Sequence, residues 1–148
     1  MNVGIALGSG SARGWAHIGV LEALASMGVE PCIVAGTSIG AVVGAAYAAG
    51  RLSAVREWAC AFSRKGVASY VNFTGLLKGL ISPGRLREAL AEHAVPEDLA
   101  IEDMPRRFAC VATEMSLGRE QWFTKGPALD AVWASMALPA VLPRVLMF

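Results

Sequence analysis

The sequence has few charged residues and no excess of either sign. Only 17% of its 148 residues are Asp, Glu, Lys or Arg, and 13 basic side chains against 12 acidic ones leave a net charge of +1. It contains no basic tract, which argues against a groove that follows the phosphate backbone of a nucleic acid. With 55% hydrophobic residues, the chain has ample apolar material for the core of one domain.

Cysteine and histidine are also scarce. Cys32, Cys60 and Cys110 lie far apart, and no Cys-x-x-Cys pair or Cys/His cluster has the spacing of metal ligands. We therefore expect no metal site and free, mostly buried thiols in a reducing compartment. The first residues carry no basic segment ahead of an apolar one, so we expect no secretory signal and a cytoplasmic location.

One uncharged stretch, residues 31–50, is about long enough to cross a bilayer as a helix. Proline, glycine and hydroxyl side chains interrupt it, and it lacks the density of Leu, Ile and Phe that inserted helices have. A buried strand at residues 32–35, followed by a helix of small residues at 38–50, explains the stretch better than a membrane span does.

Apolar runs and helical periodicity predict the remaining elements. Further strands are expected at residues 2–7, 106–115 and 120–125, and further helices at 11–28, 52–65, 84–94 and 127–138. Residues 66–84 are irregular, and within them residues 70–81 form either a lipid-facing lid or ordinary cover for the core. Strands that alternate with helices indicate an α/β layer fold around a mostly parallel sheet.

The segment "GTSIG", residues 36–40, joins the second predicted strand to the second predicted helix. Gly-x-Ser-x-Gly between a strand and a helix is typical of a nucleophile elbow, a tight turn that points the serine hydroxyl out of the fold. Gly36 and Gly40 are needed there because a side chain would collide with the neighbouring strand or helix. Ser38 is therefore the candidate nucleophile, at a helix N-terminus that favours developing negative charge. The alternative is a chance match to a short pattern.

The segment "GSGSARG", residues 8–14, connects the first predicted strand to the first helix and is a candidate oxyanion hole. Gly8, Gly10 and Gly14 let bare backbone N–H groups approach a substrate. The main alternative is a dinucleotide-binding loop. That pattern requires its third glycine where this sequence has Arg13, and it requires an acidic residue at the end of the second strand, which is absent.

Four segments together resemble the patatin-like phospholipases, and among them the bacterial proteins similar to the catalytic domain of neuropathy target esterase. They are "GSGSARGWAHIGVLEAL", "AGTSIGAVVGA", "FACVATEMSLGREQWFTKG" and "ASMALPAVLPRV". The resemblance implies a three-layer α/β/α fold with a mostly parallel central sheet, of which residues 1–148 would be the N-terminal part of a single domain. It also implies a serine acyl hydrolase that acts on phospholipid, lysophospholipid or other fatty-acyl esters through a Ser–Asp dyad, without a metal or organic cofactor.

Residue by residue, the resemblance implies that Ser38 is the nucleophile and that Gly10 and Ser11 offer the oxyanion N–H groups, with help from Ala12. Arg13 fills the basic position of the glycine-rich motif, where it would help to fix the loop. A lipid substrate further implies peripheral contact with a membrane, at its inner face.

The aspartate of the dyad is the one part that residues 1–148 do not supply. In the family it belongs to an Asp-Gly motif shortly after the segment that corresponds to "LPAVLPRV", and this sequence contains no Asp-Gly pair. Asp98, Asp103 and Asp130 do not match its position. We expect a fragment whose sheet is incomplete and whose dyad aspartate lies beyond Phe148. The alternatives are an aspartate supplied by a separate piece and an inactive remnant.

Other assignments of function remain open on the sequence alone. The same serine and oxyanion hole would serve an acyltransferase or a thioesterase, and a chain without its aspartate would suit a non-catalytic binding or regulatory protein. His17 and His93 are alternative general bases, but the simpler interpretation is that His17 packs and hydrogen-bonds near the glycine-rich loop and that His93 faces solvent. The tryptophans are scattered along the sequence, so we expect core packing for all four: Trp15, Trp58, Trp122 and Trp133.

Overall fold

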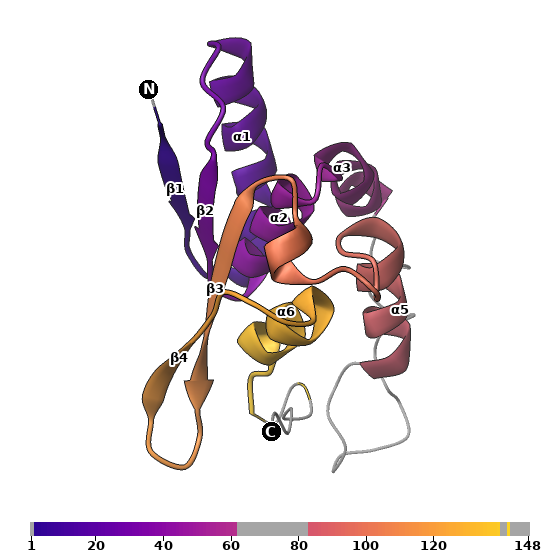
Figure 1. The fold of residues 1–148 in the computed structure, drawn as a ribbon. Coiled ribbons are helices and arrows are strands. Elements are labelled where there is room, and N and C mark those ends of the chain that lie inside the picture. Colours follow the sequence, from indigo (N-terminus) through magenta and orange to yellow (C-terminus); the bar gives the residue numbers. More distant parts are fainter. Residues whose placement is uncertain (1, 62–82, 140–141, 143–148) are drawn as a thin grey trace.

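A computed structural model of the chain describes residues 2–61, 83–139 and 142. Figure 1 shows the arrangement of its helices and strands. In chain order these are β1 (Gly4–Leu7), the 3₁₀ helix η1 (Ser11–Trp15), α1 (Ala16–Ser26), β2 (Ile33–Gly36), α2 (Ile39–Ala48), α3 (Leu52–Ala61), α5 (Pro83–His93), the 3₁₀ helix η2 (Ile101–Asp103), β3 (Arg107–Glu114), β4 (Arg119–Phe123) and α6 (Ala128–Met136).

The four strands form one sheet in the order β1-β2-β3-β4. β1 pairs with β2 and β2 with β3 in parallel, whereas β3 and β4 form an antiparallel hairpin. The register places Ala6, Ala35 and Ala109 side by side across the three parallel strands. The α/β class, the mostly parallel sheet and the predicted hairpin are thereby confirmed.

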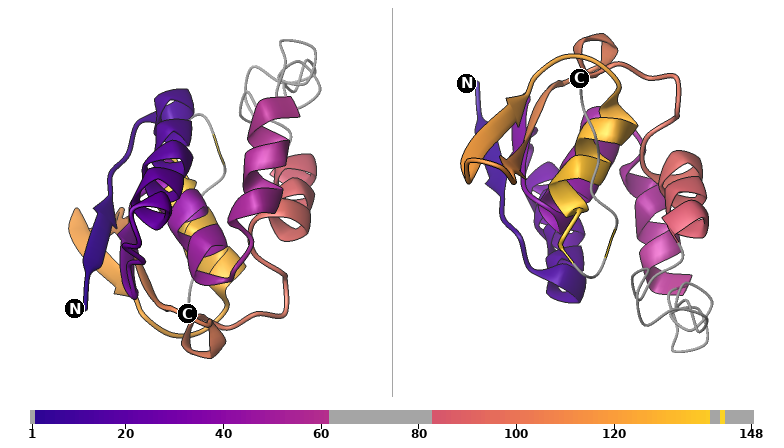
Figure 2. Two further views of the ribbon diagram at one scale, coloured as in Figure 1. Left: turned by 90° about the horizontal axis from the view of Figure 1, so that it is seen from above. Right: turned by 90° about the horizontal axis from the view of Figure 1, so that it is seen from below.

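The described helices lie on one side of the sheet, as the view from above in Figure 2 shows. α2 packs against all three parallel strands and α6 packs against β3, while α3 and α5 contact α2 and α6 from farther out. Every residue of α2 is buried, which explains why this helix is apolar on all its faces. The uncharged stretch at residues 31–50 is therefore a strand and a central helix rather than a membrane span. No helix in the described part of the chain is both long enough and apolar enough to cross a bilayer.

Two helices end as the sequence predicts. After α1, Gly28 has φ +74°, and the N–H of Val29 donates to the carbonyl of Leu24 at 2.9 Å. After α2, Gly50 has the same φ, and the N–H of Arg51 donates to the carbonyl of Ala46. Both are Schellman motifs, in which a glycine adopts the left-handed conformation that ends the helix.

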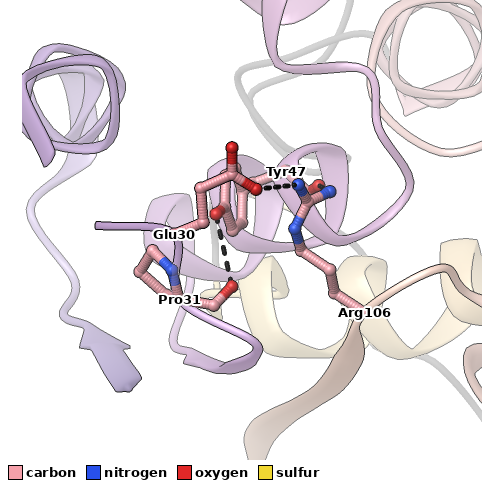
Figure 3. A network of polar contacts seen from close by, with 4 residues as sticks. All are labelled: Glu30, Pro31, Tyr47 and Arg106. Atoms are coloured by element: carbon pink, nitrogen blue, oxygen red, sulfur yellow. Dashed lines mark hydrogen bonds and ion pairs between the residues drawn. The ribbon is translucent and has the colours of Figure 1, made fainter. Parts of the chain in front are cut away.

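A network of polar contacts holds the C-terminal end of α2 (Figure 3). The Arg106 guanidinium lies 4.5 Å from the centre of the Tyr47 ring, 3.5 Å from the Tyr47 carbonyl oxygen and 3.3 Å from the Glu30 carboxylate. The Tyr47 hydroxyl donates to the carbonyl of Pro31 at 3.2 Å. These contacts tie the end of α2 to the start of β3 and to the segment before β2.

The structure corrects three details of the sequence-based expectations. The helix predicted over residues 11–28 begins with a 3₁₀ turn, η1, and becomes α-helical only at Ala16. Of the three free thiols only that of Cys110 is buried, since Cys60 is exposed and Cys32 is half-buried. Trp122, expected in the core, is 49% exposed because it lies on β4, the outer strand of the hairpin. Residues 70–81, with a lid and ordinary cover for the core as the alternatives, lie outside the described residues.

Candidate active site

Ser38 lies at the turn between β2 and α2, and its backbone has φ 55° and ψ −120°. A non-glycine residue in a sparsely populated region such as this costs about 1–3 kcal/mol and persists only where its surroundings enforce it. The side chain is half-buried rather than enclosed in the core. A strained backbone and partial exposure are what the Gly-x-Ser-x-Gly pattern predicts at Ser38.

The two glycines of the elbow are needed for close backbone packing. A Cβ atom on Gly40 would lie 2.1 Å from the carbonyl oxygen of Leu7 and 2.6 Å from that of Gly8. A Cβ atom on Gly36 would lie 2.4 Å from the carbonyl oxygen of Gly40. In addition, the N–H of Thr37 donates to the Leu7 carbonyl at 3.0 Å. The elbow therefore packs directly on the end of β1. The glycine-rich loop, residues 8–14, begins at this point.

The glycine-rich loop reaches the elbow a second time, at Gly14. A Cβ atom on Gly14 would lie 2.0 Å from Cγ2 of Ile39, the residue that follows the candidate nucleophile. Inside the loop, the N–H of Arg13 donates to the carbonyl of Gly10 at 3.1 Å, and Ser11 has φ 51°. Ser11 and Ser38 are the non-glycine residues with positive φ in the described part of the chain, so backbone strain is concentrated in these two loops.

The predicted site residues differ in their exposure. The buried ones are Gly14, Gly36 and Gly40; Gly10 and Ser38 are half-buried; Gly8, Ser11, Ala12 and Arg13 are exposed. The glycines at which the two loops pack together are thus enclosed, while the candidate oxyanion donors and the candidate nucleophile reach the surface.

Comparison with protein families gives a match over nearly the whole chain. The family model described as "Patatin-like phospholipase" matches residues 5–147. The chain belongs to the patatin-like phospholipase family. The matched residues include both the glycine-rich loop and the elbow.

Individual relatives within the patatin-like phospholipase family are similar over nearly the whole chain. An "Uncharacterized NTE family protein" of Mycobacterium tuberculosis is 38% identical over 140 residues, which cover 95% of this chain and 38% of the relative. The "Lysophospholipase NTE1" of Pyricularia oryzae is 34% identical over 158 aligned positions, covering 96% of this chain and 10% of the relative. The chain therefore spans less than two fifths of the length of these relatives.

The histidines of this patatin-like chain have structural partners. Nε2 of His17 lies 2.9 Å from the carbonyl oxygen of Gly8, to which it donates a hydrogen bond. That nitrogen therefore carries a proton and is not free to accept one from Ser38. The His93 ring stacks on Trp58 at 5.6 Å between centroids. His17 thus fastens the start of the glycine-rich loop, and His93 joins α5 to α3.

Ser135, in α6, is a site residue that sequence reasoning missed. Its hydroxyl accepts a hydrogen bond from the backbone N–H of Ser38 at 2.8 Å and donates one to the carbonyl of Val111 at 2.7 Å. A single serine inside a helix matches no functional pattern. The one signal for it in the sequence is its place in the run "ASMALP", which begins one of the four segments that resemble the patatin-like phospholipases.

The described aspartates are not associated with Ser38. Asp130, in the first turn of α6, pairs with Arg87 of α5 at 2.8 Å. Asp103 ends η2. Within residues 2–61 and 83–139, no carboxylate is hydrogen-bonded to Ser38. The described part of the chain therefore presents a candidate nucleophile and a glycine-rich loop, and no carboxylate within it is hydrogen-bonded to that serine.

Proposed function

We propose that this chain carries the nucleophile and the oxyanion hole of a serine acyl hydrolase that acts on phospholipid, lysophospholipid or other fatty-acyl esters. The observation that supports the proposal most directly is the packing of the elbow, through Gly40 and Ile39, on the glycine-rich loop. Each of these two segments also holds one serine with a strained backbone, Ser38 in the elbow and Ser11 in the loop. Relatives named as lysophospholipases favour a lipid ester as the substrate class. We further propose peripheral contact with a membrane surface, because such a substrate is held there, and place it at the inner face in line with the expected cytoplasmic location.

In the proposed reaction, Oγ of Ser38 attacks the carbonyl carbon of the ester while the dyad aspartate takes the hydroxyl proton. The negative charge that develops on the carbonyl oxygen is stabilised by the N–H groups of Gly10 and Ser11, with help from Ala12. The tetrahedral intermediate expels the alcohol, which leaves with the proton, and an acyl-enzyme remains. Water then hydrolyses the acyl-enzyme by the same steps and releases the fatty acid.

The aspartate of this dyad is proposed to lie in an Asp-Gly motif beyond Phe148. The absence of an Asp-Gly pair from residues 1–148 supports this assignment, as does the engagement of Asp130 with Arg87. Without a base the Ser38 hydroxyl is a weak nucleophile. Residues 1–148 on their own are therefore expected to show little or no hydrolysis.

A fluorophosphonate probe, which forms a covalent bond with an activated serine, tests the proposal on the protein that includes the Asp-Gly segment. Labelling should be lost in Ser38→Ala and retained in Ser26→Ala, which removes an exposed hydroxyl near the end of α1. Release of free fatty acid from lysophospholipid should follow the same pattern. Transfer of the acyl group to an added alcohol or thiol, in place of its release, would instead identify an acyltransferase.

Two results would contradict the proposal. Labelling that persists in Ser38→Ala would exclude this serine as the nucleophile. Robust hydrolysis by residues 1–148 alone, if it disappears in His17→Ala, would show that a histidine and not a distant aspartate is the base.

A further inference from the structure

We propose that Ser135 is a positioning residue, which holds the backbone of Ser38 in the conformation that points its hydroxyl outward. This inference rests on the proposed function, because it assigns a role to Ser135 in that same site. It starts from the two short hydrogen bonds of the Ser135 hydroxyl, to the Ser38 N–H at 2.8 Å and to the Val111 carbonyl at 2.7 Å.

The direction of both hydrogen bonds is determined by their partners. A carbonyl oxygen only accepts, so the single hydroxyl proton of Ser135 points at Val111. A backbone N–H only donates, so the bond from Ser38 ends on a lone pair of the same oxygen. Because both partners are main-chain groups, the hydroxyl connects the elbow before α2 to β3 through α6.

Ser38 needs such a contact for two reasons. Its φ of 55° is sparsely populated for a side-chain-bearing residue, and surrounding contacts must enforce it. Its N–H also precedes the first turn of α2, where backbone donors have no partner within the helix. The Ser135 hydroxyl satisfies that donor and resists rotation of the peptide that leads into Ser38.

The same contact bears on the oxyanion hole. Since the N–H of Ser38 is engaged by Ser135, it is not available to a substrate oxygen. The donors of the oxyanion hole must therefore come from other backbone groups, which is consistent with their assignment to the glycine-rich loop.

The hydroxyl is not needed to keep α6 in place. Leu129, Val132 and Trp133 are buried in the core and hold the helix against β3 and α2. Loss of one oxygen atom from the half-buried Ser135 should therefore leave the fold intact and release the Ser38 peptide.

Hydrogen exchange of the Ser38 amide, measured by NMR on the protein that includes the Asp-Gly segment, tests the contact without relying on activity. In Ser135→Ala the exchange rate should rise about tenfold, since a hydrogen bond of ordinary net strength is lost. The amide of Val132 in the same helix should exchange at the wild-type rate. Ser135→Thr keeps the hydroxyl and should restore protection of the Ser38 amide.

Kinetics on the same three proteins test the consequence for the site. In Ser135→Ala, kcat for lysophospholipid hydrolysis and the rate of fluorophosphonate labelling should fall about tenfold, while KM changes less than about twofold. Ser135→Thr should recover most of both rates. This split between kcat and KM is expected of a group that orients the nucleophile and does not bind substrate.

The results separate the two proposals. Unchanged exchange of the Ser38 amide in Ser135→Ala would overturn the positioning role, as would faster exchange with an unchanged kcat. If the wild type neither hydrolyses esters nor reacts with the probe, the proposed function fails, and the amide exchange still decides whether Ser135 holds the Ser38 backbone.

Discussion

At the scale of single residues, the candidate site depends on glycines that allow one backbone segment to lie against another. Gly40 is the clearest case, because the atoms that a Cβ would meet are the carbonyl oxygens of Leu7 and Gly8 and not flexible side chains. Neither oxygen can move without shifting the end of β1. The requirement for glycine at this position therefore comes from the main chain of a neighbouring element.

We predict that Gly40→Ala destabilises the protein and displaces the glycine-rich loop. Overpacking of this kind typically costs about 1–3 kcal/mol, and fluorophosphonate labelling of Ser38 should fall with the loop displaced. Gly19→Ala is the matched control, since nothing lies within 4 Å of its Cβ position in α1. It should stabilise the helix by about 0.5–1 kcal/mol. Thermal unfolding followed by circular dichroism measures both, and a Gly40→Ala protein as stable as the wild type would contradict the packing.

Individual residues of the site differ in how far they could be predicted. Gly36, Ser38 and Gly40 follow from a short pattern in which each residue type has a local steric reason. Ser135 lies 97 positions from Ser38 in the sequence, and its role depends on α6 crossing the elbow in space. No local rule distinguishes such a serine from one that merely faces solvent.

At the scale of elements, α2 has two different ends. Its N-terminal end carries Ser38 and faces the glycine-rich loop. Its C-terminal end is held by Arg106, whose backbone N–H donates to the carbonyl of Ala48 while its side chain lies over the Tyr47 ring (Figure 3). A positive charge at this end also suits the helix dipole. The candidate site and the contacts that anchor α2 therefore lie at opposite ends of this helix.

We predict that Arg106→Ala lowers the free energy of unfolding by about 1–2 kcal/mol, through loss of the ring contact and of the hydrogen bond to Tyr47. Glu30→Ala should cost less than about 0.5 kcal/mol, because its carboxylate is largely exposed and screened by solvent. Urea denaturation gives both values. Neither change should alter the rate at which the probe labels Ser38, and slower labelling in folded Arg106→Ala would mean that the two ends of α2 are coupled.

The order and type of the elements were predictable because most of them carry a strong periodic pattern with glycines at their ends. The start of the first helix was not, since the 3₁₀ turn over residues 11–15 depends on how the loop packs against Ile39. Helical propensity describes only the segment itself. Contact with α2 decides how that segment begins.

At the scale of the whole molecule, burial follows the position of each element relative to the helices. The β3–β4 hairpin projects beyond them in Figure 1, and Trp122 on its outer strand is exposed. Sequence alternation indicates which residues share a face of a strand, but it does not tell which helix covers that face. This is why the hairpin was predicted correctly and the burial of its tryptophan was not.

The burial of the cysteines also depends on the element that carries each of them. Cys110 on β3 is enclosed in the core, and burial raises the pKa of its thiol to about 12. Cys60 on α3 is exposed. Since the thiolate is the reactive form, at pH 8 only about one Cys110 thiol in ten thousand would be ionised in the folded protein.

We therefore predict that a disulfide reagent at pH 8 modifies Cys60 rapidly in the native protein and modifies Cys110 only when the core opens. Urea sufficient to unfold the chain should make both react at similar rates, and Cys60→Ser should remove only the rapid phase. The folded state holds the Cys110 proton more tightly than the unfolded state does, so this thiol stabilises the fold fully below the ordinary thiol pKa. That contribution is lost as the pH rises from about 9 towards 12. Rapid modification of Cys110 without denaturant would show that β3 is not covered by α2 and α6 in solution.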